Sequence, residues 1–277
     1  MKMRGTERNR RIAVTSMTAL MAIVAAFTAG GARANARPFA YGYDSGTLPA
    51  GQHEFELWTT WRVGRNDVYS RFDHRIEYEA GVTDTLQTAL YLNWSKASAR
   101  DPLTGSLVSE TSFGGISNEW KWKLSDPAAD PVGFAAYAEL TADTDEAEVE
   151  LKAIVDKRIG GMILAYNATV EPEFEYDAGE IEAENVNVEH NLGLSVQVSP
   201  GFSCGVEVFE HSAYTDGKPR FAALFAGPVL HVASGRFWLT ATTLIQLPAL
   251  KPSVSGQRFV LDEHEKVKAR ILVSLPL

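Results

Sequence analysis

Cysteine is almost absent from this chain, since Cys204 is the only one in 277 residues. A single cysteine excludes an internal disulfide and a cysteine-based zinc site. The six histidines show neither a His-x-x-x-His nor a His-Glu-x-x-His spacing, so the pattern does not favour a transition-metal centre. We therefore expect no cofactor and no metal-dependent chemistry.

Long apolar runs are also missing once the N-terminus is passed. No stretch after residue 34 holds 18 consecutive apolar residues, which excludes transmembrane helices. The mean hydropathy of −0.12 resembles that of a soluble protein. A membrane β-barrel gives the same average, because its strands are apolar on one face and polar on the other.

Positive charge is concentrated at the N-terminus, as in a secretory signal peptide. Five basic residues precede the apolar stretch 12–27, and Ala32-Arg33-Ala34 offers the small residues that a signal peptidase requires. The alternative is an uncleaved anchor helix, but Gly30, Gly31 and the Ala-x-Ala site favour cleavage. Residues 1–34 carry six basic residues and one acidic residue, so removing them changes the formal charge from −9 to −14. That charge argues against nucleic acid as a partner.

The remainder, residues 35–277, reads as one all-β domain because apolar residues alternate with polar ones. Leu86, Thr88, Leu90, Leu92 and Trp94 share one face, for example, and the residues between them share the other. Most segments have the length that a tilted strand needs to cross a bilayer. Twelve strands are predicted near 53–63, 71–82, 86–94, 113–124, 132–142, 147–157, 161–171, 186–198, 202–210, 221–233, 237–247 and 260–275. The strands 221–233 and 237–247 alternate weakly, which leaves their facing open.

The connections between these strands are sorted by length. Brief ones at 83–85, 125–131, 158–160, 199–201 and 234–236 alternate with longer ones at 64–70, 95–111, 172–185, 211–220 and 248–259. Short turns at one end and longer loops at the other are typical of outer-membrane barrels, closed and antiparallel. We therefore predict a twelve-stranded outer-membrane barrel surrounded by lipid, with the N-terminus and the short turns in the periplasm.

Aromatic residues support the same interpretation, because barrels carry aromatic girdles at both membrane interfaces. The alternative is the aromatic core of a soluble β-protein. The residues near predicted strand ends are Trp58, Trp61, Trp94, Trp120, Trp122, Trp238 and Tyr78.

Two local motifs invite a chemical interpretation. Residues 201–205 match Gly-x-Ser-x-Gly, which would make Ser203 the nucleophile of a hydrolase, but that motif requires a strand–turn–helix and none is predicted here. The second motif is a carboxylate run without Lys or Arg, which suits divalent cations such as Ca²⁺ or is simply a solvated acidic loop. Its members are Glu171, Glu173, Glu175, Asp177, Glu180, Glu182 and Glu184.

The polar face of the strands is the most informative pattern. Charges facing lipid are costly, so these side chains are expected to face the lumen. The predicted lumen-lining residues are Glu54, Glu56, Arg62, Arg71, Arg75, Glu77, Glu139, Lys152, Glu189, Glu207, Lys266, Lys268 and Arg270. Either they line a narrow mixed-charge pore for small solutes, or their ion pairs close the lumen and leave a structural or binding barrel. The closing strand is expected to pair Lys266, Lys268 and Arg270 with Glu54 and Glu56.

Four stretches carry a family resemblance. They are Arg37-Pro38-Phe39-Ala40-Tyr41, Thr47-Leu48-Pro49-Ala50-Gly51, the strand at 54–62, and Gly81-Val82-Thr83-Asp84-Thr85-Leu86-Gln87. Together they resemble uncharacterised Gram-negative outer-membrane barrels, similar to the MetA-pathway phenol-degradation barrel family. The resemblance implies a barrel with no assigned catalytic residue that passes small or aromatic compounds.

The signal-peptide interpretation gives a first prediction. The mature protein should begin at or near Asn35 and should fractionate with the outer membrane. N-terminal sequencing of the membrane fraction tests both points, and protein released with the periplasm by osmotic shock would contradict them.

Overall fold

The computed structural model describes residues 36–144, 146–177, 180–235 and 237–277. The predicted signal peptide, residues 1–34, lies outside the described residues. Among the residues described, no helix is long and apolar enough to cross a membrane.

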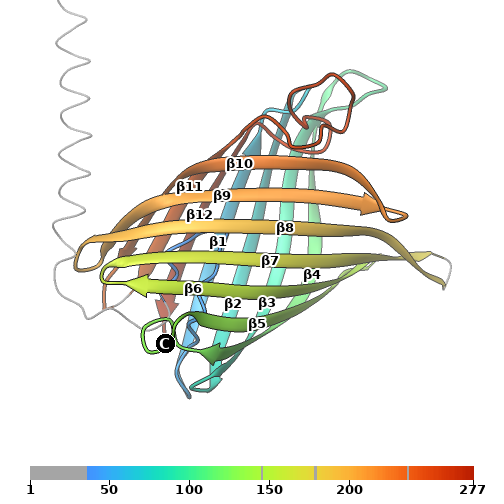
Figure 1. Ribbon diagram of the computed structural model, residues 1–277. Coiled ribbons are helices and arrows are strands. Elements are labelled where there is room, and N and C mark those ends of the chain that lie inside the picture. The colour runs from blue at the N-terminus through green and yellow to red at the C-terminus, as the bar shows by residue number, and fades with distance from the viewer. Residues whose placement is uncertain (1–35, 145, 178–179, 236) are drawn as a thin grey trace, which may run out of the picture.

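Twelve antiparallel strands form a closed barrel, in which each strand pairs with its neighbours in sequence and β1 pairs with β12 (Figure 1). The predicted fold class and strand number are confirmed. Closure removes the two sheet edges, which would otherwise leave unpaired backbone groups in lipid. The strands are β1 (His53–Val63), β2 (Tyr69–Thr83), β3 (Leu86–Arg100), β4 (Leu107–Ser125), β5 (Gly133–Ala142), β6 (Glu146–Ile159), β7 (Met162–Asp177), β8 (Glu180–Ser199), β9 (Phe202–Thr215), β10 (Lys218–Ala233), β11 (Trp238–Gln246) and β12 (Val267–Pro276).

The two ends of the barrel differ. The turn end carries the connections after β2, β4, β6, β8 and β10, together with the start of β1 and the end of β12. The opposite, loop end carries the long connection 247–266, drawn in red in Figure 1. The predicted loops 95–111, 172–185 and 211–220 are wrong, because β3 and β4, β7 and β8, and β9 and β10 continue through most of them. The first eight residues of β4 are all exposed, so both faces meet water there and the alternation disappears although pairing continues.

The outer surface is apolar around the barrel. Leu90 and Leu192 are 56% and 46% exposed, and similar side chains stand outward on other strands. An apolar surface of this extent is far larger than the patches of soluble monomers and suits the hydrocarbon of a bilayer. Further members of this belt are Leu57, Leu92, Leu140, Leu151, Leu164, Val206, Leu230 and Ile271.

The aromatic residues divide between the two faces. Trp61, Trp120, Trp122 and Tyr78 stand outward, as a girdle requires. Trp58 and Trp238 are buried inside, so their assignment to a girdle is wrong. Trp58 shares the inward parity of Glu54 and Glu56 on β1, and this parity alone places it in the lumen.

The two weakly alternating strands differ in their inward faces. Phe221, Ala223 and Phe225 of β10 and Leu244 of β11 face inward and pack in one cluster with Val260 of the 247–266 connection. The inward face of β11 also carries the buried polar residues Thr240, Thr242 and Gln246. Apolar inward residues on β10 and mixed ones on β11 explain why the sequence pattern left the facing open.

The belt generates a second prediction. Leu90→Arg and Leu192→Arg should each lower the free energy of unfolding by about 2–4 kcal/mol, because each places a charge near the bilayer midplane. Urea titration of the protein folded in lipid vesicles measures this. Leu107→Arg is the matched control, because Leu107 is exposed in the extended part of β4 at the loop end. An equal cost at Leu107 would show that the belt does not face lipid.

Candidate functional site: a lumen crossed by the N-terminal segment

Residues 36–52, the N-terminal segment, run inside the barrel as far as Leu48 and then lead to β1 through the exposed Ala50, Gly51 and Gln52 (the blue trace before β1 in Figure 1). Phe39 and Ala40 are completely buried, and Tyr41, Tyr43 and Leu48 nearly so. The segment has no strand of its own. Its backbone groups must therefore find partners among the side chains of the barrel wall, because buried backbone groups without partners are costly.

Glu207 on β9 supplies the central anchor. One of its carboxylate oxygens accepts hydrogen bonds from three consecutive backbone N–H groups, those of Ala40, Tyr41 and Gly42, at 3.1, 2.9 and 3.2 Å. Hydrogen bonds to an ionised acceptor are about twice as strong as neutral ones. Glu207 was predicted as a lumen-lining charge, and its position in the structure makes it the support of the segment.

Other strands hold the segment further along. Asn167 on β7 accepts a hydrogen bond from the Tyr43 N–H at 2.6 Å and donates one to the Tyr43 carbonyl at 3.0 Å. Gln87 on β3 accepts from the Leu48 N–H at 2.9 Å. Arg270 on β12 donates to the Ala40 carbonyl at 3.2 Å and lies 3.8 Å above the ring of Tyr41. Contacts with strands on all sides fix the segment across the lumen.

Phe39 packs against Gly193 on β8. A Cβ built at Gly193 would lie 2.5–2.9 Å from the Phe39 ring, too close for any side chain. The ring therefore occupies the space that the missing side chain of Gly193 leaves, and this part of the lumen is tightly packed.

Arg37 meets a group of buried carboxylates near the turn end. Its guanidinium lies 3.6 Å from the Glu56 carboxylate, 3.8 Å from the centre of the Tyr43 ring and 4.5 Å from that of Trp58. Burial alone would lower the pKa of Arg37, but the neighbouring Tyr43 and the glutamates, Glu56 first, raise it above its ordinary value. The guanidinium therefore stays charged and offsets part of the negative charge around it.

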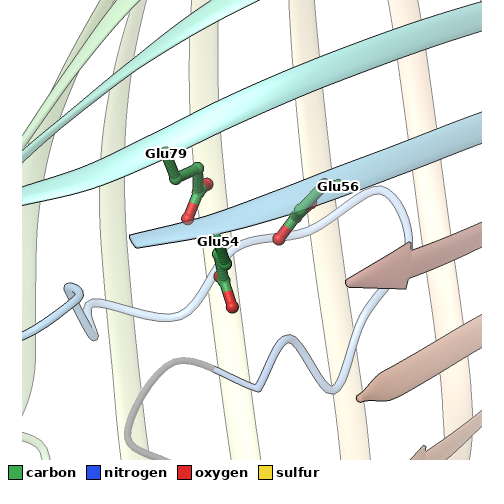
Figure 2. A group of neighbouring side chains, drawn as sticks. All are labelled: Glu54, Glu56 and Glu79. Carbon is green, nitrogen blue, oxygen red and sulfur yellow. The ribbon is translucent and has the colours of Figure 1, made fainter. Parts of the chain in front are cut away.

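These carboxylates come from facing positions of β1 and β2. The register sets Glu54 opposite Glu79 and Glu56 opposite Glu77, and Figure 2 shows Glu54, Glu56 and Glu79 gathered inside the barrel. Carboxylate oxygens of these three lie within 4.8 Å of one another, close enough to hold a hard divalent cation. Ser274 donates to Glu54 at 2.8 Å and the Trp58 indole donates to Glu56 at 2.9 Å.

The ion pairs predicted across the β1–β12 seam do not form. The register places Glu54 and Glu56 opposite Pro276 and Ser274, and it places Lys268 opposite Arg62. Antiparallel pairing sends the start of one strand to the end of the other, so the acidic start of β1 cannot reach the basic start of β12. Lys266 precedes β12, is exposed, and does not line the lumen.

A cavity of about 660 Å³ lies on the loop side of the N-terminal segment, with Tyr41 and Tyr43 among the residues at its inner boundary. Eight of the predicted residues line it: Arg62, Arg71, Arg75, Glu139, Lys152, Glu189, Lys268 and Arg270. The structure thus brings these eight to one space and places Glu54, Glu56 and Glu77 nearer the turn end.

Several cavity charges are paired with neighbours. Asp73 forms ion pairs with Arg62 at 2.6 Å and with Arg71 at 2.5 Å, and Lys152 lies 2.7 Å from Glu150. Arg75 on β2 reaches Glu139 on β5 at 3.2 Å.

A histidine pair closes the cavity toward β9, and sequence reasoning missed it. His264, in the 247–266 connection, lies 2.8 Å from His211 on β9, measured between ring nitrogens. Burial, together with the nearby Lys268, holds the pKa of His264 well below its ordinary value. The ring is therefore neutral at physiological pH. The two histidines are 53 residues apart, so only the inward fold of the connection brings them together.

The two local motifs have different outcomes. Ser203 lies at the beginning of strand β9, opposite Gln197 and His231 in register, so residues 201–205 do not form the strand–turn–helix of a nucleophile elbow. The carboxylate run belongs to the β7–β8 hairpin and not to a loop. Glu171 and Glu173 line the cavity, and Glu173 forms a possible cation-binding group with Glu146 and Glu148. The side chains of Asp177, Glu180, Glu182 and Glu184 lie outside the described residues.

The closed barrel, its apolar belt and its charged interior allow comparison with known proteins. The chain belongs to DUF6662. This is a family of unknown function, and its model matches residues 32–276. No curated protein matches the sequence.

Several solved structures share the fold of this DUF6662 member. The COG4313 outer membrane channel from Pseudomonas putida F1 aligns with a TM-score of 0.61 at 13% identity, covering 83% of this chain and 97% of the channel. The NanC porin aligns with a TM-score of 0.54 at 11% identity, covering 80% and 100%. The β domain of the Bordetella autotransporter BrkA aligns with a TM-score of 0.50 at 12% identity, covering 82% and 100%. These likenesses establish an outer-membrane barrel fold. No phenol-degradation homologue is among them.

The contact between Phe39 and Gly193 generates a third prediction. Gly193→Ala should displace the ring and loosen the N-terminal segment while the barrel stays folded, because no strand pairing depends on that contact. Chymotrypsin cleavage after Tyr41, followed by mass spectrometry in detergent micelles, should become faster by about tenfold, the effect of weakening local packing by about 1.4 kcal/mol.

Two matched variants make this test specific. Gly161→Ala should leave cleavage unchanged, because a Cβ there meets only ordinary contacts at 3.5–3.6 Å. Phe39→Leu combined with Gly193→Ala should restore slow cleavage in part, because the smaller side chain leaves space for the new methyl group. Unchanged cleavage in Gly193→Ala would show that the contact does not hold the segment.

Proposed function

We propose that this outer-membrane barrel is a facilitator for small polar solutes whose lumen is closed at rest by the N-terminal segment. The observation that supports this is the charged cavity of about 660 Å³, which ends inward at Tyr41 and Tyr43 of that segment. A space of this size matches the pockets that hold small ligands. The charged groups act as lining in this proposal and not as catalysts.

The orientation follows from the predicted signal peptide. An exported chain enters the outer membrane from the periplasm, so the N-terminus and the turn end face that compartment and the cavity faces outward. A solute would enter from the loop end and would meet the N-terminal segment before the periplasm. Passage therefore requires the segment to move.

The attachments of the segment suit such movement. Most of them are hydrogen bonds with side chains of the barrel wall. Backbone hydrogen bonds to the barrel are found near the end of the segment, where the Gly51 N–H donates to the Gly81 carbonyl at 2.9 Å. A typical hydrogen bond contributes about 0.5–1.5 kcal/mol net. Because the ladder of twelve strand pairs does not include the segment, withdrawing it breaks no strand pairing.

The same segment also favours a second candidate, a binding barrel whose lumen never opens. In that case the cavity would hold a ligand at the cell surface and nothing would pass. The resemblance noted above implies small or aromatic compounds for either candidate. Single-channel conductance distinguishes these two candidates, because only the facilitator conducts.

A fourth prediction addresses the gate. A mature chain lacking residues 35–49 should insert as a barrel and should conduct in planar bilayers at several times the unit conductance of the intact protein. Glu207→Ala should raise the open probability of the intact chain, because it removes the acceptor of three hydrogen bonds.

Val206→Ala is the matched control for Glu207→Ala, because Val206 is the outward-facing neighbour on β9 and is 52% exposed. It should leave single-channel behaviour unchanged. Zero conductance in both the intact and the shortened chain would refute the facilitator and favour the binding barrel. Equal, nonzero conductance in both would show that the segment is not the gate.

A further inference from the structure

The charges that line the cavity are separated by sign onto two walls. The basic wall, on β12, β1 and β2, contributes five cationic residues and one carboxylate, namely Arg62, Arg71, Arg75, Lys268, Arg270 and Asp73. The acidic wall, on β5 to β8 with the β5–β6 turn, contributes eight carboxylates and one cation, namely Glu139, Asp143, Glu146, Glu148, Glu150, Glu171, Glu173, Glu189 and Lys152.

The strand order places these walls on opposite sides. In the closed sequence of twelve strands, β7 is six strands from β1 in either direction. The acidic wall is centred between β6 and β7 and the basic wall on β1, so the two face each other across the lumen.

The ion pairs do not cancel this separation, because most of them form within one wall. Asp73 is the only carboxylate among the cavity residues of the basic wall and is shared by Arg62 and Arg71, and Lys152 pairs with Glu150 of its own wall. Arg75 and Glu139 form an ion pair that joins the two walls. Each wall therefore keeps an excess of its own sign among the described residues.

Opposed walls of this kind select among solutes by charge. A confined, low-dielectric space strengthens the field between them. An anion is attracted to the basic wall but repelled by the acidic one, and a cation meets the reverse. A small solute with both charges can orient along the field and satisfy both walls at once.

We propose that this cavity binds small zwitterions, with their carboxylate toward the β12–β1–β2 wall and their ammonium group toward the β5–β8 wall. The inference rests on the proposed function for its biological meaning, since the cavity would be the entry site of the facilitator. Binding itself does not require that the barrel opens.

The direct test measures binding affinity by calorimetry, with three probes of nearly equal size. The intact protein is held in micelles of a detergent that is not itself zwitterionic. We expect γ-aminobutyrate to bind at least about tenfold more tightly than butyrate or n-butylammonium, the scale of one added charge-assisted hydrogen bond. Equal affinities for the three probes, or tightest binding of either singly charged probe, would overturn the proposal.

Two variants assign the charges to their walls. Arg71→Gln should weaken γ-aminobutyrate while leaving n-butylammonium at least as well bound, and Glu148→Gln should weaken γ-aminobutyrate while leaving butyrate at least as well bound. Arg71 is suitable because Asp73 keeps Arg62 as a partner. The surface changes Lys96→Gln and Glu110→Gln, at exposed positions outside the cavity lining, are the charge-matched controls and should have no effect.

The binding and conductance experiments fail independently. Preferential binding of γ-aminobutyrate without conductance in any variant would leave this inference standing and refute the facilitator. Conductance in the shortened chain without a preference for γ-aminobutyrate would leave the facilitator standing and refute the zwitterion site. If the cavity variants fold poorly, the three-probe comparison on the unmodified protein still decides.

Discussion

A buried carboxylate needs hydrogen-bond donors. Glu207 accepts hydrogen bonds from three backbone N–H groups of a segment more than 160 residues away in the sequence. Much of the interior follows from this interaction. It fixes the path of residues 40–42, which sets Phe39 into the space at Gly193 and brings Tyr41 under Arg270. The inner boundary of the cavity is the result. A barrel of this width would otherwise have to fill its lumen with side chains or leave it to water.

The charges of the lumen serve two separate purposes. Near the turn end, the carboxylates of β1 and β2 are buried, and the N-terminal segment brings Arg37 to them. In the cavity, the charges are partly hydrated and divided by sign between two walls. The alternation of the strands predicted all these charges as one set of lumen-lining residues. That set therefore contains both groups that anchor the N-terminal segment, such as Glu207, and groups that a solute can reach, such as Arg71.

The fold could be predicted from the sequence because lipid imposes a strict rule on facing. Leu90 and Leu92 had to be outward if Tyr91 was inward, and the structure agrees. The rule fails where lipid is absent. Strands extending beyond the membrane lose their alternation, so the start of β4 and the tip of the β7–β8 hairpin were predicted as loops. Asp216-Gly217, a frequent two-residue hairpin turn, was a usable signal in the third such region. Alternation also gives no information about a segment that pairs with no strand. The N-terminal segment was therefore noted only as part of a family resemblance, and its place in the lumen was not predicted.

The closure of the barrel by β1 and β12 also has a consequence for assembly. The last strand must be made before the seam can form, so folding cannot finish while the chain is still arriving. The N-terminal segment, however, leads directly into β1 at the turn end, and its partners on β7, β9 and β12 belong to the later half of the chain. It can therefore reach its place only when those strands have taken theirs. The first part of the described chain is thus among the last to become ordered, and it enters the barrel from the turn end.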